Sequence, residues 1–234
     1  MCGIAGSINF KLDIPVLTKA LFHRGPDEQT TFEEHNLQLH HHRLAILDIA
    51  GGHQPMHLGH FTIIFNGEIY NHLEVRKKFK LSCNSNSDTE TILHAYTQLG
   101  FSCLQEFDGM FAMAIYDRDK QELFLARDRA GKKPLYYYSE GQAFVFSSEL
   151  NALRSQLDLQ INETHIQQYV RMGYFYKSST PYTNVSELPG GSYATVSLTQ
   201  PGIQVTKWWN INSFYTKPGI DNFETATEKV ESIL

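Results

Sequence analysis

An unbroken apolar run at residues 110–116 constrains the fold of this chain more than any other segment. A short apolar run bounded by turn residues is typical of a strand that is buried on both faces. Residues 117–120 (Asp-Arg-Asp-Lys) form the expected turn, and residues 122–127 are expected to return as the next strand. The run therefore indicates a strand inside a layered fold, with a hairpin-like partner.

Further strands and helices are expected along the chain. Runs rich in β-branched and aromatic residues predict strands at residues 61–65, 135–138, 143–147 and 192–198. The pattern of apolar residues predicts helices at residues 13–21, 73–79, 89–99 and 165–172. Strands and helices interleaved in this way indicate a mixed, layered α and β domain rather than a run of βαβ crossovers.

Two local signals add detail to these elements. Asn66-Gly67 follows the strand expected at 61–65, and this dipeptide is typical of a tight turn. Ser87 can cap the helix that follows it, and Glu90 stands three residues later in the capping-box position.

The last quarter of the chain has a different composition. From about residue 180, proline and glycine become frequent, which predicts turns around one strand pair. Beyond these turns, Phe223, Ala226, Val230 and Ile233 recur at helical spacing. A helix cannot bury such a stripe alone, so we expect residues 223–233 to pack against something else.

The overall composition excludes several classes of protein. Twenty Lys and Arg against 25 Asp and Glu give a net charge of −5, without the basic footprint of a nucleic-acid-binding domain. No apolar run approaches the roughly 20 residues of a membrane helix, and the first residues lack the features of a signal peptide. Three cysteines are too few for a disulfide framework. These features predict a cytoplasmic protein with neither membrane nor nucleic acid as a partner.

Cys2 directly follows the initiator methionine, and its small side chain permits removal of Met1. The thiol and a free α-amine would then belong to one residue, and an α-amine with a pKa of about 7.7–8 can act as a base at neutral pH. This is the arrangement of an N-terminal nucleophile. The alternative interpretation is that Cys2 is a small buried residue at the start of a strand.

Short polar motifs follow one another along the chain in a defined order. They are residues 1–6 (Met-Cys-Gly-Ile-Ala-Gly), 23–27 (His-Arg-Gly-Pro-Asp), 42–48 (His-Arg-Leu-Ala-Ile-Leu-Asp), 65–71 (Phe-Asn-Gly-Glu-Ile-Tyr-Asn), 87–90 (Ser-Asp-Thr-Glu), 107–112 (Phe-Asp-Gly-Met-Phe-Ala) and 126–136 (Ala-Arg-Asp-Arg-Ala-Gly-Lys-Lys-Pro-Leu-Tyr). From residue 1 to about residue 212, this series resembles the class II glutamine amidotransferase domain of glutamine-hydrolysing asparagine synthetases. The resemblance implies the α+β fold of N-terminal-nucleophile hydrolases, which is a four-layer αββα sandwich.

The resemblance also implies a glutamine-binding active site. Cys2 matches the nucleophile that attacks the side-chain amide, and Asn66 and Gly67 match the pair that stabilises the oxyanion. Arg43 matches the residue that binds the α-carboxylate, and Asp88 matches the carboxylate that receives the α-ammonium. The further positions implied for the same site are Leu44, Ile46 and Glu68.

Several of these residues have an ordinary structural interpretation when taken alone. Arg43 could form a surface ion pair, Asp88 could be a charge at the start of a helix, and Glu68 could be a solvated side chain. Residues 23–27 also match the family, and we interpret them as a structural loop close to the site.

Two groups of potential metal ligands are expected to have no such role. The three histidines at 40–42 are adjacent on a strand, so their side chains point to alternate faces and cannot converge on one ion. Cys83 and Cys103 lack CxxC spacing and are expected to be packing residues.

The chain departs from the family pattern near its end. Full-length members continue into a domain that adenylates a carboxylate with ATP, and their pyrophosphate loop, roughly Ser-Gly-Gly-x-Asp-Ser, has no match here. We therefore divide the chain into a glutaminase domain, residues 1–199, and a linker with the first helix of a synthetase domain, residues 200–234. The chain would be either part of a longer enzyme or a gene product that works with a separate synthetase.

The function implied by the resemblance is hydrolysis of L-glutamine to glutamate and ammonia through a thioester on Cys2. A synthetase domain, in cis or in trans, would use the ammonia for ATP-dependent amidation of aspartate to asparagine, or of a related carboxylate. No cofactor is expected for the glutaminase domain, and ATP and Mg²⁺ would serve the synthetase domain alone. The oligomeric state is open, with a homodimer as one candidate.

Two rival functions remain. Within the class, the rival is the glutaminase half of an enzyme that aminates a sugar phosphate. Outside the class, the rival is a non-catalytic module that senses glutamine or binds a partner. A retained Met1 would block the α-amine and would favour this second rival.

Overall fold

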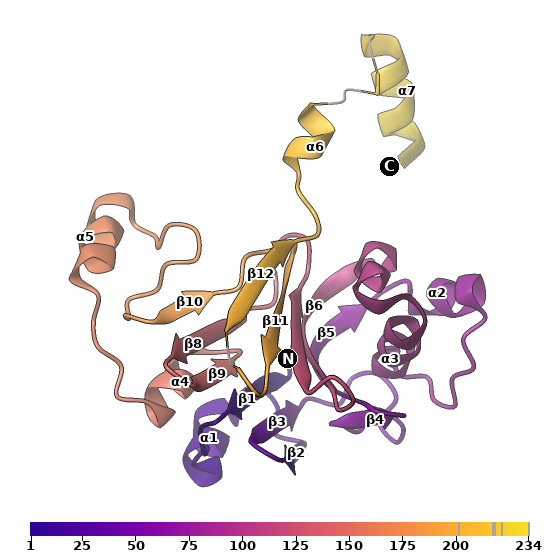
Figure 1. The fold of residues 1–234 in the computed structure, drawn as a ribbon. Coiled ribbons are helices and arrows are strands. Elements are labelled where there is room, and N and C mark those ends of the chain that lie inside the picture. The colour runs from indigo at the N-terminus through magenta and orange to yellow at the C-terminus, as the bar shows by residue number, and fades with distance from the viewer. Residues whose placement is uncertain (201, 217–218, 221, 234) are drawn as a thin grey trace.

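Strand β6 (Gly109–Asp117) contains the apolar run and lies inside a six-stranded sheet. The computed structural model describes residues 1–200, 202–216, 219–220 and 222–233. Its strands form two six-stranded sheets that pack face to face, with helices on the outer face of each sheet (Figure 1). This is the expected four-layer αββα sandwich.

The strand order separates the two sheets clearly. Sheet I has the order β10-β8-β9-β1-β3-β2, and sheet II has the order β12-β11-β7-β6-β5-β4. All strand pairings within these described sheets are antiparallel, in agreement with the expected absence of βαβ crossovers. The strands of sheet I are β1 (Gly3–Ile8), β2 (Glu28–Glu34), β3 (Leu37–Arg43), β8 (Tyr136–Glu140), β9 (Ala143–Ser147) and β10 (Val185–Glu187). Besides β6, the strands of sheet II are β4 (Met56–Leu58), β5 (Phe61–Ile69), β7 (Glu122–Arg127), β11 (Ser192–Ser197) and β12 (Ile203–Lys207).

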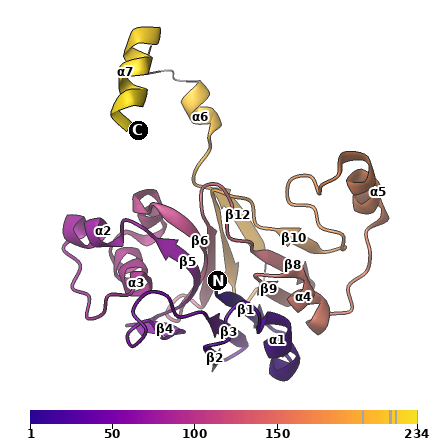
Figure 2. The ribbon, with the colours of Figure 1, turned by 180° about the vertical axis from the view of Figure 1, so that it is seen from behind.

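The helices form the two outer layers. Helices α1 (Ile14–Leu21) and α4 (Leu150–Gln156) pack on sheet I, whereas α2 (His72–Phe79), α3 (Asp88–Leu99) and a 3-10 helix (Gly100–Glu106) pack on sheet II. The two groups lie on opposite sides of the sandwich in both views (Figures 1 and 2). The other helices are α5 (Glu163–Met172), α6 (Asn212–Tyr215) and α7 (Phe223–Ile233). None of the helices in the described ranges has the length and apolarity needed to cross a membrane.

The side chains of β6 explain why its sequence is apolar without alternation. Ala112, Ala114 and Tyr116 lie in the core between the two sheets. Phe111, Met113 and Ile115 lie in the second core, beneath α2 and α3. Since successive side chains of a strand point to opposite faces, a strand between two cores must be apolar at every position. The prediction of a doubly buried strand is confirmed.

Asn66 and Gly67 do not form the tight turn that their dipeptide suggested. They lie inside β5, which continues to Ile69 and pairs with β6 along its whole length. The tertiary pairing overrides the local turn preference, because the sheet supplies a partner strand at these positions. The interpretation of Asn66-Gly67 as a turn is therefore wrong.

The start of α3 follows its prediction in part. Ser87 caps the helix, since its Oγ accepts a hydrogen bond from the Thr89 N–H at 3.3 Å. Glu90 reaches further back than a capping box requires and accepts hydrogen bonds from the N–H groups of Asn84 and Ser85. The five predicted helices correspond to α1, α2, α3, α5 and α7, and the six predicted strands correspond to β5, β6, β7, β8, β9 and β11, with shifts at some of their ends.

The C-terminal segment leaves the sandwich after β12, which is an edge strand of sheet II. Helix α7 lies away from both sheets in the two views (Figures 1 and 2). Its apolar stripe is exposed, with Phe223 and Ile233 at 85% and 82% of their full accessibility. The expectation that another surface covers this stripe, and the division of the chain after residue 199, stay predictions.

Candidate active site

One cavity brings together all the residues predicted for the glutamine site. It is lined by the start of the chain, the end of β3 with the loop after it, the second half of β5, and the first residues of α3. Both sheets and one helical layer therefore contribute to its wall. The predicted residues in this wall are Cys2, Arg43, Leu44, Ile46, Asn66, Gly67, Glu68 and Asp88.

Cys2 lies directly before β1, where the pairing of Gly3 with His42 sets it beside the end of β3. The backbone N–H of Leu44 donates to the Cys2 Sγ at 3.4 Å, and the Leu44 carbonyl oxygen lies 3.7 Å from the same sulfur. Burial raises the pKa of the Cys2 thiol above its ordinary value. The Leu44 hydrogen bond and the charges of the chain terminus and Arg43 act in the opposite direction. The thiol therefore needs a base beside it to react at neutral pH.

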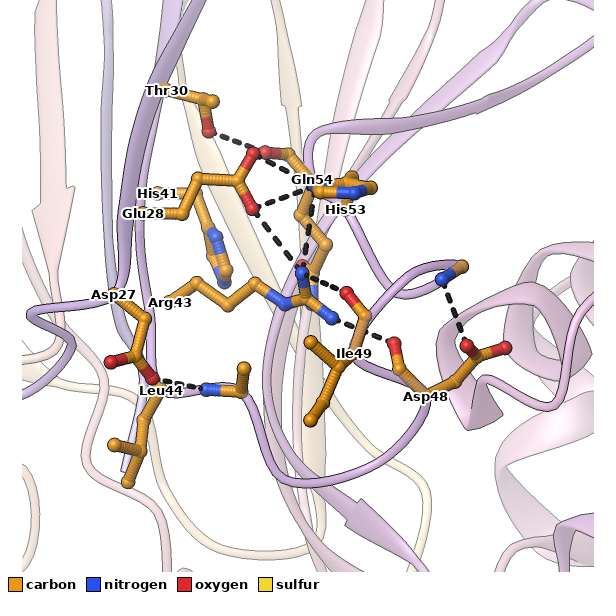
Figure 3. Close-up of polar contacts among 12 residues, drawn as sticks. Asp27, Glu28, Thr30, His41, Arg43, Leu44, Asp48, Ile49, His53 and Gln54 are labelled. Atoms are coloured by element: carbon orange, nitrogen blue, oxygen red, sulfur yellow. Dashed lines mark hydrogen bonds and ion pairs between the residues drawn. The ribbon is translucent and has the colours of Figure 1, made fainter.

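The loop at residues 23–27 supports Cys2, as its structural interpretation predicts. The Arg24 Nε donates to the Cys2 carbonyl oxygen at 3.1 Å. The Asp27 Oδ2 accepts a hydrogen bond from the Ala45 N–H at 2.8 Å (Figure 3). The loop thus fixes both the nucleophile and the segment that follows β3.

Arg43 is buried, with 5% of its surface exposed, so the surface ion pair does not describe it. Its Nη1 donates to the Ile49 carbonyl oxygen at 3.0 Å, and its Nη2 donates to the Asp48 carbonyl oxygen at 2.8 Å (Figure 3). The same Nη1 lies 3.3 Å from the Glu28 carboxylate. A guanidinium has five N–H donors, so this group both closes the loop at residues 44–54 and keeps donors for a ligand.

One edge of β5 faces the cavity with a row of backbone donors. In an antiparallel strand, alternate N–H groups point to the same edge, here those of Phe65, Gly67 and Ile69. The Gln54 Oε1 accepts from the Phe65 N–H at 2.6 Å, and the Asp88 Oδ2 accepts from the Ile69 N–H at 2.9 Å. The N–H of Gly67 lies between these two bonds, on the wall of the cavity. It points away from β6 and donates to no group of the residues that the structure describes.

The Asn66 side chain is the second unengaged donor. It is 1% exposed, and neither its Nδ2 nor its Oδ1 has a hydrogen-bond partner among the residues that the structure describes. Leaving a buried amide unpaired costs roughly 1–3 kcal/mol, which a ligand in the cavity would recover.

The neighbouring position can hold only glycine. A Cβ at Gly67 would lie 2.2 Å from the Met110 carbonyl oxygen and 2.7 Å from the Phe111 Cα. The close approach of β5 and β6 at this point brings a bare backbone N–H to the cavity wall, and a side chain here would push the strands apart.

Asp88 is the first residue of α3 and is 5% exposed. Burial raises the pKa of its carboxyl to about 6, although hydrogen bonds from the Ile69 and Thr89 N–H groups oppose the rise. The nearby charge of Glu68 raises it further. Among the described residues, no cationic side chain forms an ion pair with this carboxylate, and a ligand ammonium would supply the positive charge.

The three histidines of β3 point to alternate faces, as expected. The rings of His40 and His42 lie 4.9 Å apart on one face, and the His41 Nε2 lies 3.3 Å from the Phe65 carbonyl oxygen on the other. Burial lowers the pKa of His41 to about 3, so this ring is neutral and connects sheet I to β5 beside Asn66.

The cavity also contains residues that the sequence analysis did not predict. The ammonium of Lys133 lies 2.8 Å from the Met1 Sδ, and burial lowers the pKa of this lysine. Lys133 belongs to the motif at residues 126–136, and this motif could have indicated its place in the site. Thr89 likewise belongs to the motif at residues 87–90. Gln54 had no local signal, because its role arises from contacts with Phe65 in β5 and Thr89 in α3.

Taken together, the cavity offers a thiol, two N–H donors that engage none of the described residues, a buried guanidinium and a buried carboxylate. The guanidinium and carboxylate complement the two charged groups of a free amino acid. The two N–H donors complement an oxygen that becomes negative during attack by the thiol.

Comparisons with known proteins point to one family. Residues 1–209 match the model of a family described as a glutamine amidotransferase domain. A protein of Methanocaldococcus jannaschii is 36% identical over 97% of this chain, and asparagine synthetase [glutamine-hydrolyzing] 3 of Bacillus subtilis is 33% identical over 100% of it. The match covers 50% and 40% of these relatives, so the chain spans about half their length or less.

The fold also has a counterpart among solved structures. The glutamine phosphoribosylpyrophosphate amidotransferase of B. subtilis superposes with a TM-score of 0.62. The superposition covers 89% of this chain and 49% of that chain, at 17% sequence identity.

Proposed function

Because the chain belongs to the family of glutamine amidotransferase domains, we propose that it hydrolyses L-glutamine to glutamate and ammonia, with Cys2 as the nucleophile. The observation that carries the proposal is the pair of unengaged donors, the Asn66 side chain and the Gly67 N–H, in the same cavity as the Cys2 thiol. A buried amide without a partner is costly unless a ligand completes its hydrogen bonds.

In this proposal, the two charged groups on the α-carbon of glutamine bind to buried charges of the opposite sign. Arg43 donates to the α-carboxylate with the N–H groups that its loop contacts do not use. Asp88 accepts hydrogen bonds from the α-ammonium, which supplies a positive charge beside this buried carboxylate. Glu68, Leu44 and Ile46 line the remaining wall. The side-chain amide of the substrate then extends toward Cys2.

The first chemical step forms a thioester. The Cys2 sulfur attacks the amide carbon of the substrate, and the α-amine of Cys2 takes the thiol proton. The carbonyl oxygen becomes an oxyanion that accepts hydrogen bonds from Asn66 and Gly67. The carbon–nitrogen bond then breaks, and the ammonium of the terminus returns its proton to the leaving nitrogen, which departs as ammonia.

The second step regenerates the enzyme. A water molecule attacks the thioester carbon and gives a proton to the α-amine, and the same two donors stabilise the oxyanion. Collapse of this intermediate breaks the carbon–sulfur bond, and the ammonium of the terminus returns its proton to the sulfur, which restores the thiol and the neutral amine. The new carboxyl group loses its proton to solvent, and glutamate leaves.

Removal of Met1 is a condition of the mechanism, because a peptide nitrogen cannot serve as the base. In the unprocessed chain, burial lowers the pKa of the Met1 α-amine, and the charges of Arg24 and Lys133 lower it further. The nearby charge of Cys2 opposes this lowering. After processing, the base is the α-amine of Cys2, whose carbonyl oxygen accepts a hydrogen bond from the Arg24 Nε at 3.1 Å.

The acceptor of the ammonia would be a carboxylate activated by a synthetase domain, in cis or in trans. The similarity to a B. subtilis asparagine synthetase supports aspartate as this acceptor. In the proposal, ATP and Mg²⁺ serve the synthetase domain, and the glutaminase chemistry uses only residues of this chain.

The proposal is tested by ammonia release from L-glutamine, with protein whose intact mass shows that Met1 has been removed. We expect release that a thiol-alkylating glutamine analogue blocks, with one analogue attached to Cys2. Glutamine binding without ammonia release, in the presence of the synthetase partner, would refute hydrolysis and support a glutamine-sensing module. Absence of both binding and release would refute the site itself.

A further inference from the structure

Outside the active site, Cys83, Glu90 and His94 bring three potential metal ligands together. One ligand atom from each residue, a thiol sulfur, a carboxylate oxygen and a ring nitrogen, lies within 4.8 Å of the other two. All three residues are partly buried. We propose that they form a binding site for Zn²⁺ or a similar thiophilic divalent cation, in place of the packing role that the sequence predicted for Cys83.

The helix places two of the ligands on one face. Glu90 and His94 are four residues apart in α3, and residues at this spacing are neighbours on a helix surface. The Glu90 Oε1 lies 3.8 Å from the His94 Nε2. In a tetrahedral zinc site, metal–ligand bonds of about 2.0–2.3 Å give ligand–ligand separations of about 3.3–3.6 Å. The pair is therefore close to the required geometry.

The third ligand comes from the segment before the helix. Cys83 lies in the connection between α2 and α3, and its sulfur is within 4.8 Å of both helix ligands. Side-chain rotation has to shorten its distances by about 1.2 Å at most to reach tetrahedral spacing. A water molecule would complete four ligands, as in other sites with three protein ligands.

The surroundings hold the carboxylate of Glu90 in place. Its Oε1 accepts from the Asn84 N–H at 2.8 Å, and its Oε2 accepts from the N–H and Oγ of Ser85 at 2.7 Å and 2.6 Å. A carboxylate has about four lone-pair sites, so Oε1 retains one for a cation. Outer hydrogen bonds of this kind orient metal ligands.

The charge balance also suits a divalent cation. Metal binding replaces the thiol proton of Cys83, which leaves to solvent, and the resulting thiolate and the Glu90 carboxylate neutralise two positive charges. The nearby Arg76 guanidinium is engaged by the Thr91 hydroxyl and by the carbonyl oxygens of Ser85 and Ser87. Metal binding would thus tie the connecting segment to α3, whose first residue lies in the active-site cavity.

The test uses the full chain, free of any affinity tag, with the Cys2→Ala substitution. The substitution is needed because the terminal thiol and amine of Cys2 could chelate metal themselves. Its loss of catalysis does not affect the test, because metal binding is the quantity measured. We expect the reduced, metal-free protein to bind one Co²⁺ per chain with a thiolate-to-cobalt charge-transfer band in the near ultraviolet. Zn²⁺ should displace the Co²⁺, remain bound through gel filtration and raise the melting temperature.

Three further variants identify the ligands. Cys83→Ser should abolish the charge-transfer band, and His94→Gln should weaken Zn²⁺ binding by at least the roughly 10–100-fold typical of outer-shell changes. The matched control is Cys103→Ala, because Cys103 is a buried thiol within an apolar cluster and should leave the metal site intact. Far-ultraviolet circular dichroism establishes that each variant is folded. The proposal would be overturned if the charge-transfer band persisted in the Cys83→Ser variant. It would also be overturned if the folded Cys2→Ala protein bound neither metal, or bound both only at millimolar concentration.

Discussion

Lowering the pH from about 8 to about 5 should weaken glutamine binding about tenfold, because the proposed ammonium-binding carboxylate titrates in this range. Burial raises the pKa of Asp88 to about 6. The α-ammonium of glutamine needs the ionised form, and apparent affinity scales with the fraction of protein in the competent state. About half of the molecules are ionised at pH 6, and about one in eleven at pH 5.

Isothermal titration calorimetry of the Cys2→Ala protein measures this effect directly, since glutamine cannot be consumed. The dissociation constant should be flat above about pH 7 and should rise tenfold per pH unit well below 6. The Asp88→Asn variant is the control, and it should bind more weakly with no slope between about pH 5 and 8. An unchanged dissociation constant in the Cys2→Ala protein, or an equal slope in the control, would refute the assignment of Asp88.

The same burial has a consequence for the ligand-free protein. A carboxyl whose folded pKa lies above its unfolded value of 3.8 binds its proton more tightly in the folded state. The contribution of Asp88 to the free energy of unfolding should therefore fall as the pH rises from about 4 to about 6, by at most about 3 kcal/mol. At pH 8, Asp88→Asn should be more resistant to urea than the unsubstituted chain, and glutamine should reduce the difference.

Four other substitutions separate the proposed roles. Cys2→Ala should abolish ammonia release and preserve glutamine affinity, because it removes only the nucleophile; residual release would identify another nucleophile. Arg43→Ala should mainly raise KM, since the α-carboxylate lies remote from the bond that breaks; an unchanged KM would remove Arg43 from the site. Asn66→Ala should lower kcat by about 10²–10³ with little change in Tm, because its amide bonds to no described residue. Gly67→Ala should lower the free energy of unfolding by at least about 1–3 kcal/mol, measured by urea denaturation, because its Cβ would meet the Met110 carbonyl oxygen at 2.2 Å.

The sequence located the cavity more accurately than it located the strands around it. The ordered motifs predicted eight residues that the fold does bring together, from Cys2 at the chain start to Asp88 on α3. Such motifs contain the residue types that the site needs. They can therefore be recognised in the sequence even when the secondary structure around them is unknown. The doubly buried β6 was predicted for a similar reason, because its two cores leave no polar position.

The misread and unpredicted elements depended on long-range contacts. Asn66-Gly67 has the local signature of a turn, yet the pairing of β5 with β6 keeps it extended. Strand β3 was not predicted, because three of its buried residues are histidines. Their polar side chains do not give the apolar pattern that indicates a buried strand. Gln54 contacts β5 and α3 from a loop, and nothing in its neighbours along the chain indicates that contact.

The active site spans the interface between the two sheets, with Arg43 on sheet I, Cys2 directly before its strand β1, and Asn66 and Gly67 on sheet II. The distance from the sulfur to the two donors is therefore set by how the sheets pack, and not by any one strand. In a mutational survey, conservative changes among the inter-sheet core residues, such as Ala114, could preserve folding and still reduce turnover. Loss of activity at such a position would report a small displacement of one sheet against the other, and would not show that the residue contacts glutamine.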